Sequence, residues 1–178
     1  MEQESPESKE PKPVDELRKF LESHRDERHV IVLQDFPDPD AISSALAHAL
    51  LSTKHGIRTE LVYLGEVSHP ENLALLRVLE IDLTKWTPDF KAEEFDGAIF
   101  VDNQAVNTAL WPKLEKAGVK PLAIVDHHST QAAPQVEFSD IRSVGATATI
   151  YTQYIKEGLM PRRLDILYTK RMTYWSLG

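Results

Sequence analysis

Three polar clusters, each placed directly after a short apolar run, hold the residues of this chain that are best suited to chemistry. The clusters are the triplet Asp126-His127-His128, the single residue Asp102, and the acidic segment 35–40. Carboxylate oxygens and imidazole nitrogens are the donors that bind ions such as Mn²⁺ and Mg²⁺. The clusters therefore indicate a divalent-metal site, provided that the fold brings them together.

The elements that must position these clusters alternate along the chain. Apolar runs predict strands, and apolar residues at helical spacing predict helices. The expected strands cover residues 29–34, 58–64, 97–102, 121–126 and 136–138, and the expected helices cover 14–24, 40–55, 72–79, 108–117 and 147–156. This alternation predicts an α/β fold in three layers, an open parallel sheet with helices on both faces. Ligands bind such sheets at the carboxyl ends of the strands, where all three clusters are expected.

The ends of the chain differ in composition from its centre. Residues 1–15 are rich in proline and charge, which predicts a disordered acidic tail, and residues 16–178 are long enough for one domain. Residues 162–178 are compatible with a helix but finish on Tyr174, Trp175 and Leu177. Such a terminus suggests a missing continuation or a partner surface.

The charge balance limits the classes of partner. With 20 basic and 28 acidic side chains the formal net charge is −8, which argues against nonspecific binding of long nucleic acid but not against a small phosphate-bearing substrate. The absence of cysteine excludes disulfides and thiolate metal sites. No apolar run approaches the roughly 20 residues that cross a membrane, and the N-terminus does not resemble a secretory signal. A cytoplasmic protein is expected.

The acidic segment leads into the clearest predicted helix. Asp38 and Asp40 lie two residues apart in a proline-rich loop, so both carboxylates could face one ion. Ser43 and Ser44 lie at the start of the helix, whose free N–H groups favour a phosphate. The alternative is an ordinary turn in which Asp40 only caps the helix.

Histidine at the end of the fourth predicted strand is more informative than histidine elsewhere. His127 and His128 follow an aspartate, an arrangement that favours one metal ligand and one phosphate contact over a polar loop. Asp102 taken alone fits a loop or a cap equally well. The remaining histidines lack such neighbours and are expected at the surface or at helix ends: His24, His29, His48, His55 and His69.

Together the clusters resemble the DHH phosphoesterase superfamily, which is named for the triplet at 126–128. The segment 36–45 is similar to its first motif, Pro-Asp-x-Asp followed by small residues, and Val101-Asp102 is similar to its second. Residues 145–149 resemble the family's segment between the third and fourth motifs. The resemblance covers about residues 28–157.

The resemblance implies a Rossmann-like DHH domain that binds divalent ions, usually two of manganese. By this resemblance Asp38, Asp40, Asp102 and His127 are metal ligands, and Asp102 bridges the ions. The resemblance also implies that His128 contacts the substrate phosphate. Asp102, His127 and His128 are then the catalytic residues, and Asp126 either binds the metal or supports a residue that does. Paired ions of this kind generate a hydroxide and clamp the phosphoryl oxygens.

Two features depart from the family pattern. Gln34 stands where many relatives place a histidine, so we expect it to support the ligands rather than to bind the metal. The fourth motif, an aspartate after an apolar strand, is not found, since residues 162–178 contain only Asp165 in a different context. The family's smaller C-terminal domain is not found either. These features indicate a catalytic-domain portion, or a truncated or diverged member, that binds one or two ions of Mn²⁺ or Mg²⁺.

The leading functional hypothesis is a metal-dependent phosphoesterase that acts on a small nucleotide or a short single-stranded oligonucleotide, of the nanoRNase or bisphosphate-nucleotide phosphatase type. One alternative is a non-catalytic domain that binds metal and nucleotide, and another is a pyrophosphatase or polyphosphatase. A homodimer is compatible with each. Dinucleotide-binding and kinase-type phosphate loops are excluded, because the glycines that they require are missing.

Overall fold

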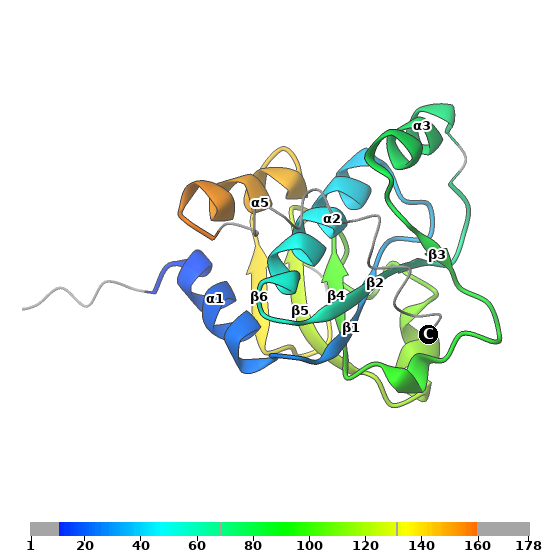
Figure 1. Ribbon diagram of the computed structural model, residues 1–178, viewed down its shortest axis with the longest axis horizontal. Helices are drawn as coiled ribbons and strands as arrows, with labels where there is room; N and C mark the ends of the chain where they lie inside the picture. Colours follow the sequence, from blue (N-terminus) through cyan, green and yellow to red (C-terminus); the bar gives the residue numbers. More distant parts are fainter. Residues whose placement is uncertain (1–10, 68, 131, 160–178) are drawn as a thin grey trace, which may run out of the picture.

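Six parallel strands form the centre of the molecule in the computed structural model, which describes residues 11–67, 69–130 and 132–159 (Figure 1). The order in the sheet is β3-β2-β1-β4-β5-β6, and every neighbouring pair is parallel. The strands are β1 (Arg28–Val32), β2 (Arg58–Tyr63), β3 (Thr84–Lys85), β4 (Gly97–Val101), β5 (Lys120–Asp126) and β6 (Phe138–Ile141). The helices are α1 (Pro13–Ser23), α2 (Pro39–Thr53), α3 (Pro70–Leu79), α4 (Trp111–Lys116) and α5 (Thr147–Lys156), with a 3₁₀ turn η1 (Ala92–Glu94).

Helices cover both faces of the sheet, so the predicted three-layer α/β fold is confirmed. On one face Ile31, Ile99 and Val125 pack in a core with apolar residues of α1, α2 and α5. On the other face Val30 and Phe100 pack with residues of α4 and η1. Because both faces are covered, every residue of β4 is buried, which is why this strand reads as an uninterrupted apolar run.

The register brings the carboxyl ends of the three central strands to the same level. Val32 of β1 pairs with Phe100 of β4, and Val101 of β4 pairs with Val125 of β5. The residues that follow these strands therefore emerge side by side along one edge of the sheet.

Several predicted boundaries shift. The helix at 147–156 is confirmed, but the one at 108–117 shortens to α4, because Thr108 accepts a hydrogen bond from the amide of Leu110 and forms a turn there instead. The strand expected at 136–138 lies at Phe138–Ile141, and the two-residue β3 and the turn η1 are too short for periodicity to reveal. The helix predicted at 14–24 is confirmed as α1, Pro13–Ser23, so the predicted tail ends before residue 13 rather than at about 15. Residues 1–10 and 162–178 lie outside the described residues.

Two of the isolated histidines contradict their predicted surface or helix-end position. His29 and His48 are fully buried, the first within β1 and the second within α2. His48 Nδ1 lies 2.9 Å from the hydroxyl of Tyr151, and burial lowers the pKa of His48 to about 3. The partner comes from α5, more than 100 positions away, so the sequence around His48 carries no sign of it.

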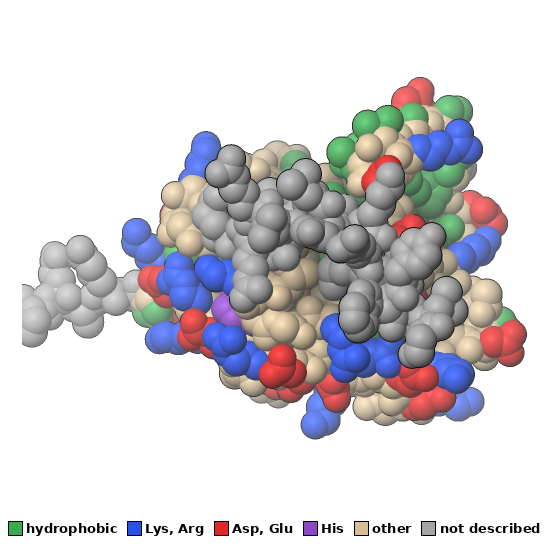
Figure 2. Space-filling model, in the orientation of Figure 1, with side chains coloured by type: hydrophobic (Ala, Val, Ile, Leu, Met, Phe, Trp, Pro, Cys, Tyr) green, Lys and Arg blue, Asp and Glu red, His purple; other side chains and the backbone are tan. Residues whose placement is uncertain are grey.

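The face in Figure 2 mixes basic and acidic side chains, and apolar side chains gather over α3. Exposed apolar residues there include Leu73, Val78 and Leu79. Among the helices of the described residues, none combines the length and the apolar character needed to cross a membrane.

Candidate metal centre

The predicted site residues converge at the carboxyl ends of β1, β4 and β5. In the sheet, β2 and β3 lie on one side of β1, whereas β4, β5 and β6 lie on the other side. The strand order therefore reverses between β1 and β4. Such a switch point opens a crevice in which α/β proteins bind ligands. Asp38 and Asp40 follow β1, Asp102 follows β4, and the triplet at 126–128 ends β5. The starts of α2 and α5 face the same edge.

Asp102 has the most constrained environment of these residues. Its side chain is 2% exposed, and its backbone has a φ of 59°, in the left-handed region that few residues other than glycine adopt. The amide of Asp102 donates to the carbonyl of Val125, and the hydroxyl of Thr147 donates to Asp102 Oδ1 at 2.8 Å. Strained, buried polar residues of this kind concentrate at functional sites.

The charge on Asp102 is costly in this position. Burial raises the pKa of Asp102 to about 7, and the negative charges of Asp40 and Asp38 act in the same direction, whereas the hydrogen bond from Thr147 opposes them. A bound cation would remove this cost, because it attracts all three carboxylates at once.

His127 presents one nitrogen to these carboxylates. Its Nδ1 lies 3.0 Å from the carbonyl of Val144 and must donate to it, so the lone pair of the neutral ring is on Nε2. This Nε2 lies 3.5 Å from Asp102 Oδ1 and 3.6 Å from Asp40 Oδ2. Two ligands of one ion with bonds near 2.1 Å lie about 3.0–3.4 Å apart, so these three groups are placed for a shared ion. The carbonyl behind the ring fixes its orientation, as is usual for metal-binding histidines.

Asp38 and Asp40 each combine a capping contact with a position at the site. Asp38 caps α2, since its Oδ1 accepts the amide of Ala41 at 2.9 Å. Asp40 binds the start of α5 instead, and the amides of Thr147 and Ala148 donate to its two oxygens at 2.8 Å each. The helix cap that we considered for Asp40 is thus real but belongs to another helix. A carboxylate has about four lone-pair positions, so both residues retain capacity for an ion.

Asp126 holds the histidines rather than facing the centre. It is buried, and its Oδ1 accepts the amide of His127 at 2.9 Å and Nδ1–H of His128 at 2.8 Å, while Gln104 donates to Oδ2 at 2.7 Å. The hydrogen bond to Asp126 raises the pKa of His128, and the charge of Asp102 adds to this effect, although burial opposes it. His128 is half-exposed, and its raised pKa favours the cationic form of the ring, which fits a phosphate contact.

The two serines at the start of α2 were predicted to contact a substrate phosphate, but their hydroxyls have other partners in the structure. Ser44 is fully buried and donates to Asp40 Oδ1 at 3.3 Å, so it cannot contact a substrate and instead supports Asp40. The Ser43 hydroxyl donates to the carbonyl of Pro39 at 2.5 Å, which leaves it committed to its own helix. Gln34 donates to Asp102 Oδ2 at 3.5 Å, which fits the supporting position expected for it.

Sequence reasoning assigned no role to several residues that build the site. Thr147 binds Asp102 through its hydroxyl and Asp40 through its amide, and Gln104 holds Asp126. The family-like segment 145–149 carried the only signal for Thr147. Nothing in the sequence around Gln104 indicates its contact with a residue 22 positions away.

The donor set fits a hard or borderline divalent ion. Ligand atoms of Asp102, His127 and His128 lie within 4.8 Å of one another, and the carboxylates of Asp38 and Asp40 border the same centre. All of the donors are oxygen or imidazole nitrogen, as Mn²⁺ and Mg²⁺ sites require. Asp38, Asp40, Asp102 and His127 are the residues that would hold such an ion.

The fold and this donor set define an α/β domain with a candidate metal centre at the switch point of its sheet. The family model "DHH family, N-terminal domain" matches residues 29–173, and the chain belongs to this family. An exopolyphosphatase-related protein from Bacteroides fragilis shares the fold, with a TM-score of 0.61 and 16% identity over 82% of this chain and 43% of that one.

Relatives at higher identity are longer than this chain. A probable manganese-dependent inorganic pyrophosphatase from Bacillus cereus is 32% identical over 135 residues, 73% of this chain and 41% of the relative. An uncharacterized protein from Methanocaldococcus jannaschii is 32% identical over 122 residues, 68% of this chain and 24% of that protein. The chain thus spans less than half the length of these relatives.

Replacing Thr147 with valine is expected to weaken Mn²⁺ binding by roughly 10- to 100-fold, the usual effect of losing a group that orients a metal ligand. The hydroxyl that steadies Asp102 Oδ1 disappears, while the amide that binds Asp40 remains. Thr149→Val, two positions along α5 and exposed, is the matched control and should bind Mn²⁺ as the unchanged chain does. Equal affinities for the two variants by calorimetry would contradict this role.

Proposed function

We propose that this chain is the catalytic-domain part of a phosphoesterase that depends on one or two divalent ions, Mn²⁺ or Mg²⁺, and hydrolyses phosphate ester bonds of a small nucleotide or a short oligonucleotide. The observation that carries the proposal is Asp102. It is buried and left-handed, and it faces His127 Nε2 with two more carboxylates nearby. Such an arrangement is costly without a cation, and membership of the DHH family agrees with a phosphate substrate.

A bound ion supplies an acidified water and neutralises charge on the phosphate. The side chains of the site have two further roles, metal binding and phosphate binding. Asp38, Asp40, Asp102 and His127 would hold the ion. His128 is oriented by Asp126, and its raised pKa favours the protonated ring, so it would donate Nε2–H to a phosphate oxygen and balance its negative charge.

A second candidate is the hydrolysis of pyrophosphate or polyphosphate. It is favoured by the Bacillus cereus relative, described as a probable manganese-dependent inorganic pyrophosphatase, and by the exopolyphosphatase-related structure. Both classes of substrate carry the phosphate group that we propose His128 contacts. A third reading, a domain that binds nucleotide without turning it over, is motivated by Gln34, which stands where many relatives place a histidine.

One panel of assays separates these readings. The purified chain is loaded with Mn²⁺ and incubated in parallel with a dinucleotide, adenosine bisphosphate, pyrophosphate and tripolyphosphate. Release of mononucleotide or of nucleotide-derived phosphate supports the leading proposal, whereas phosphate from pyrophosphate or tripolyphosphate alone supports the second. Calorimetric binding of Mn²⁺ and nucleotide with no turnover of any substrate supports the binding domain and overturns the enzymatic proposal.

The affinity for Mn²⁺ is expected to fall with acidity. Because the pKa of Asp102 is about 7 in the folded chain, a proton competes with the ion below that pH, and binding releases the proton. One such group predicts a loss of affinity of roughly 25-fold between about pH 7.5 and 5.5. Competition with an indicator dye at several pH values, corrected for protonation of the dye, measures this. A flat profile would contradict the assignment of Asp102 as a ligand.

A further inference from the structure

A second cluster of imidazole and carboxylate groups lies at the opposite end of the sheet, where β1 begins. His24 directly follows α1, Glu27 lies directly before β1, and His29 is the second residue of β1. Glu137, directly before β6, reaches the same cluster. None of these residues takes part in the metal centre at the carboxyl ends of the strands.

One carboxylate oxygen joins the two imidazoles. Glu27 Oε2 lies 2.8 Å from His24 Nδ1 and 2.9 Å from His29 Nε2, and the ligand atoms of the three residues lie within 4.8 Å of one another. The ligands of a tetrahedral zinc ion with bonds near 2.1 Å lie about 3.4 Å apart. Opening the two short contacts by about half an ångström would therefore admit an ion.

The protonation states suit metal binding. Burial lowers the pKa of His29, which favours the neutral ring that a metal requires. Burial acts to raise the pKa of Glu27, but the hydrogen bonds from His29 and His24 outweigh it, so the pKa is lowered and the carboxylate is ionised.

Packing alone does not account for His29. Its side chain has no exposure, Nδ1 has no hydrogen-bond partner in the described part of the chain, and Nε2 contacts Glu27. Burying an imidazole with one unpaired nitrogen costs more than burying an aliphatic side chain of similar size. The contact of its Nε2 with Glu27 ties this buried histidine to the cluster.

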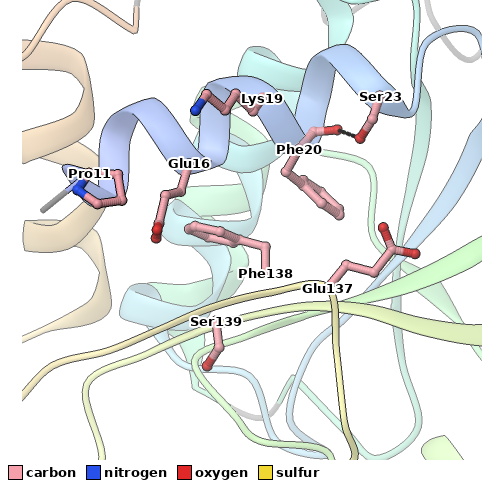
Figure 3. A pocket seen from close by; sticks show the side chains of 8 residues that line it. All are labelled: Pro11, Glu16, Lys19, Phe20, Ser23, Glu137, Phe138 and Ser139. Atoms are coloured by element: carbon pink, nitrogen blue, oxygen red, sulfur yellow. Dashed lines mark hydrogen bonds between the residues drawn. The ribbon is translucent and has the colours of Figure 1, made fainter.

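Glu137 orients the other imidazole. Its Oε2 lies 3.1 Å from His24 Nε2, on the side of the ring opposite to Glu27. A carboxylate behind a histidine that faces a metal with its other nitrogen is the usual support of a zinc ligand. Phe20 packs against the ring of His24 with centroids 4.6 Å apart. Phe20 and Glu137 line a hollow of about 480 Å³ beside α1, and Figure 3 shows their side chains there. Glu27 is 34% exposed, so an ion from solvent can reach its carboxylate directly.

We propose that His24, Glu27 and His29 form a separate site for a divalent transition-metal ion of the zinc class, with Glu137 as its supporting carboxylate. Two imidazoles and one carboxylate are a known zinc ligand set with an open position for water. Imidazole-rich sites favour Zn²⁺ over Mn²⁺, which separates this site chemically from the carboxylate-rich centre. The ion would tie the end of α1 to the first residues of β1 and so stabilise the fold.

The test measures zinc in a chain already saturated with Mn²⁺. We expect the unchanged chain to hold one more equivalent of Zn²⁺ after dialysis than Glu27→Gln, which keeps the size of the side chain but lowers the zinc affinity by at least about 100-fold. Added Zn²⁺ should raise the melting temperature of the unchanged chain and leave that of Glu27→Gln unmoved. Equal zinc content in the two proteins would overturn the proposal and leave a hydrogen-bonded cluster only.

Two controls and a direct measurement complete the experiment. Glu137→Gln should weaken zinc binding by about 10- to 100-fold, as the loss of a supporting carboxylate does, and the exposed His69→Gln should not change it. If Glu27→Gln fails to fold, X-ray absorption of the zinc-loaded, Mn²⁺-saturated unchanged chain decides the question. A shell with two imidazole nitrogens supports the site, and a shell of oxygen alone, or with one imidazole, overturns it.

Discussion

Asp102→Asn is expected to abolish Mn²⁺ binding and, at the same time, to stabilise the metal-free chain at neutral pH. The amide lacks the anionic oxygen that faces His127 Nε2, so the affinity should fall by more than about 100-fold, beyond the loss expected for a supporting residue. The amide also removes a buried charge that lies beside two other carboxylates. Calorimetry with Mn²⁺ and thermal unfolding in a chelator measure the two effects.

The sign of the stability effect follows from proton linkage. The pKa of Asp102 rises from an ordinary 3.8 to about 7 on folding, so between these values the folded chain binds more protons than the unfolded chain. The stability of the metal-free protein therefore falls as the pH rises through this window. In Asp102→Asn the stability of the metal-free protein should fall less with rising pH. The extra stability of this variant over the unchanged chain should disappear near pH 4.

Asp26→Asn is a closely matched control. Asp26 also has a left-handed backbone, with a φ of 64° against 59° for Asp102, and asparagine tolerates that conformation at both positions. Asp26 lies before β1, at the other end of the sheet, and its substitution should leave Mn²⁺ affinity unchanged. Equal metal affinity in the two variants would refute the assignment of Asp102.

The strands were predictable because their burial is nearly complete. Gly97–Val101 and residues 122–126 of β5 are buried throughout, so each appears in the sequence as an apolar run that only a sheet covered on both faces can accommodate. The positions of Asp102 and of the triplet followed from the same pattern. Residues that end parallel strands must share one edge, whatever the details of the loops.

The rest of the site depends on contacts between distant segments. Thr147 meets Asp40 across 107 positions, and Ser44 turns inward because α2 packs against α5. The local sequence predicts neither the contact of Thr147 with Asp40 nor the burial of Ser44, since a serine in the first turns of a helix fits an exposed phosphate contact equally well. The buried position of His29 was hidden for the same reason, because its partner Glu27 is unremarkable in the sequence.

His127→Gln and His128→Gln are expected to separate metal binding from the handling of substrate. Glutamine lacks the fixed imidazole nitrogen that His127 presents between Asp102 and Asp40, so His127→Gln should weaken Mn²⁺ binding by more than about 100-fold. His128 bonds Asp126 and is half-exposed, so His128→Gln should bind Mn²⁺ within about threefold of the unchanged chain but lower kcat/KM roughly 100-fold.

The comparison is informative because the two histidines are adjacent and their rings lie 4.2 Å apart, so a general loss of local structure would affect both variants alike. Metal affinity by calorimetry and kcat/KM at saturating Mn²⁺ must therefore be measured on the same preparations. A drop in Mn²⁺ affinity of similar size in both variants would show that His128 is a ligand and not a phosphate contact. Unchanged Mn²⁺ affinity in His127→Gln would mean that the ion lies away from His127 Nε2, and the arrangement of the centre proposed above would be wrong.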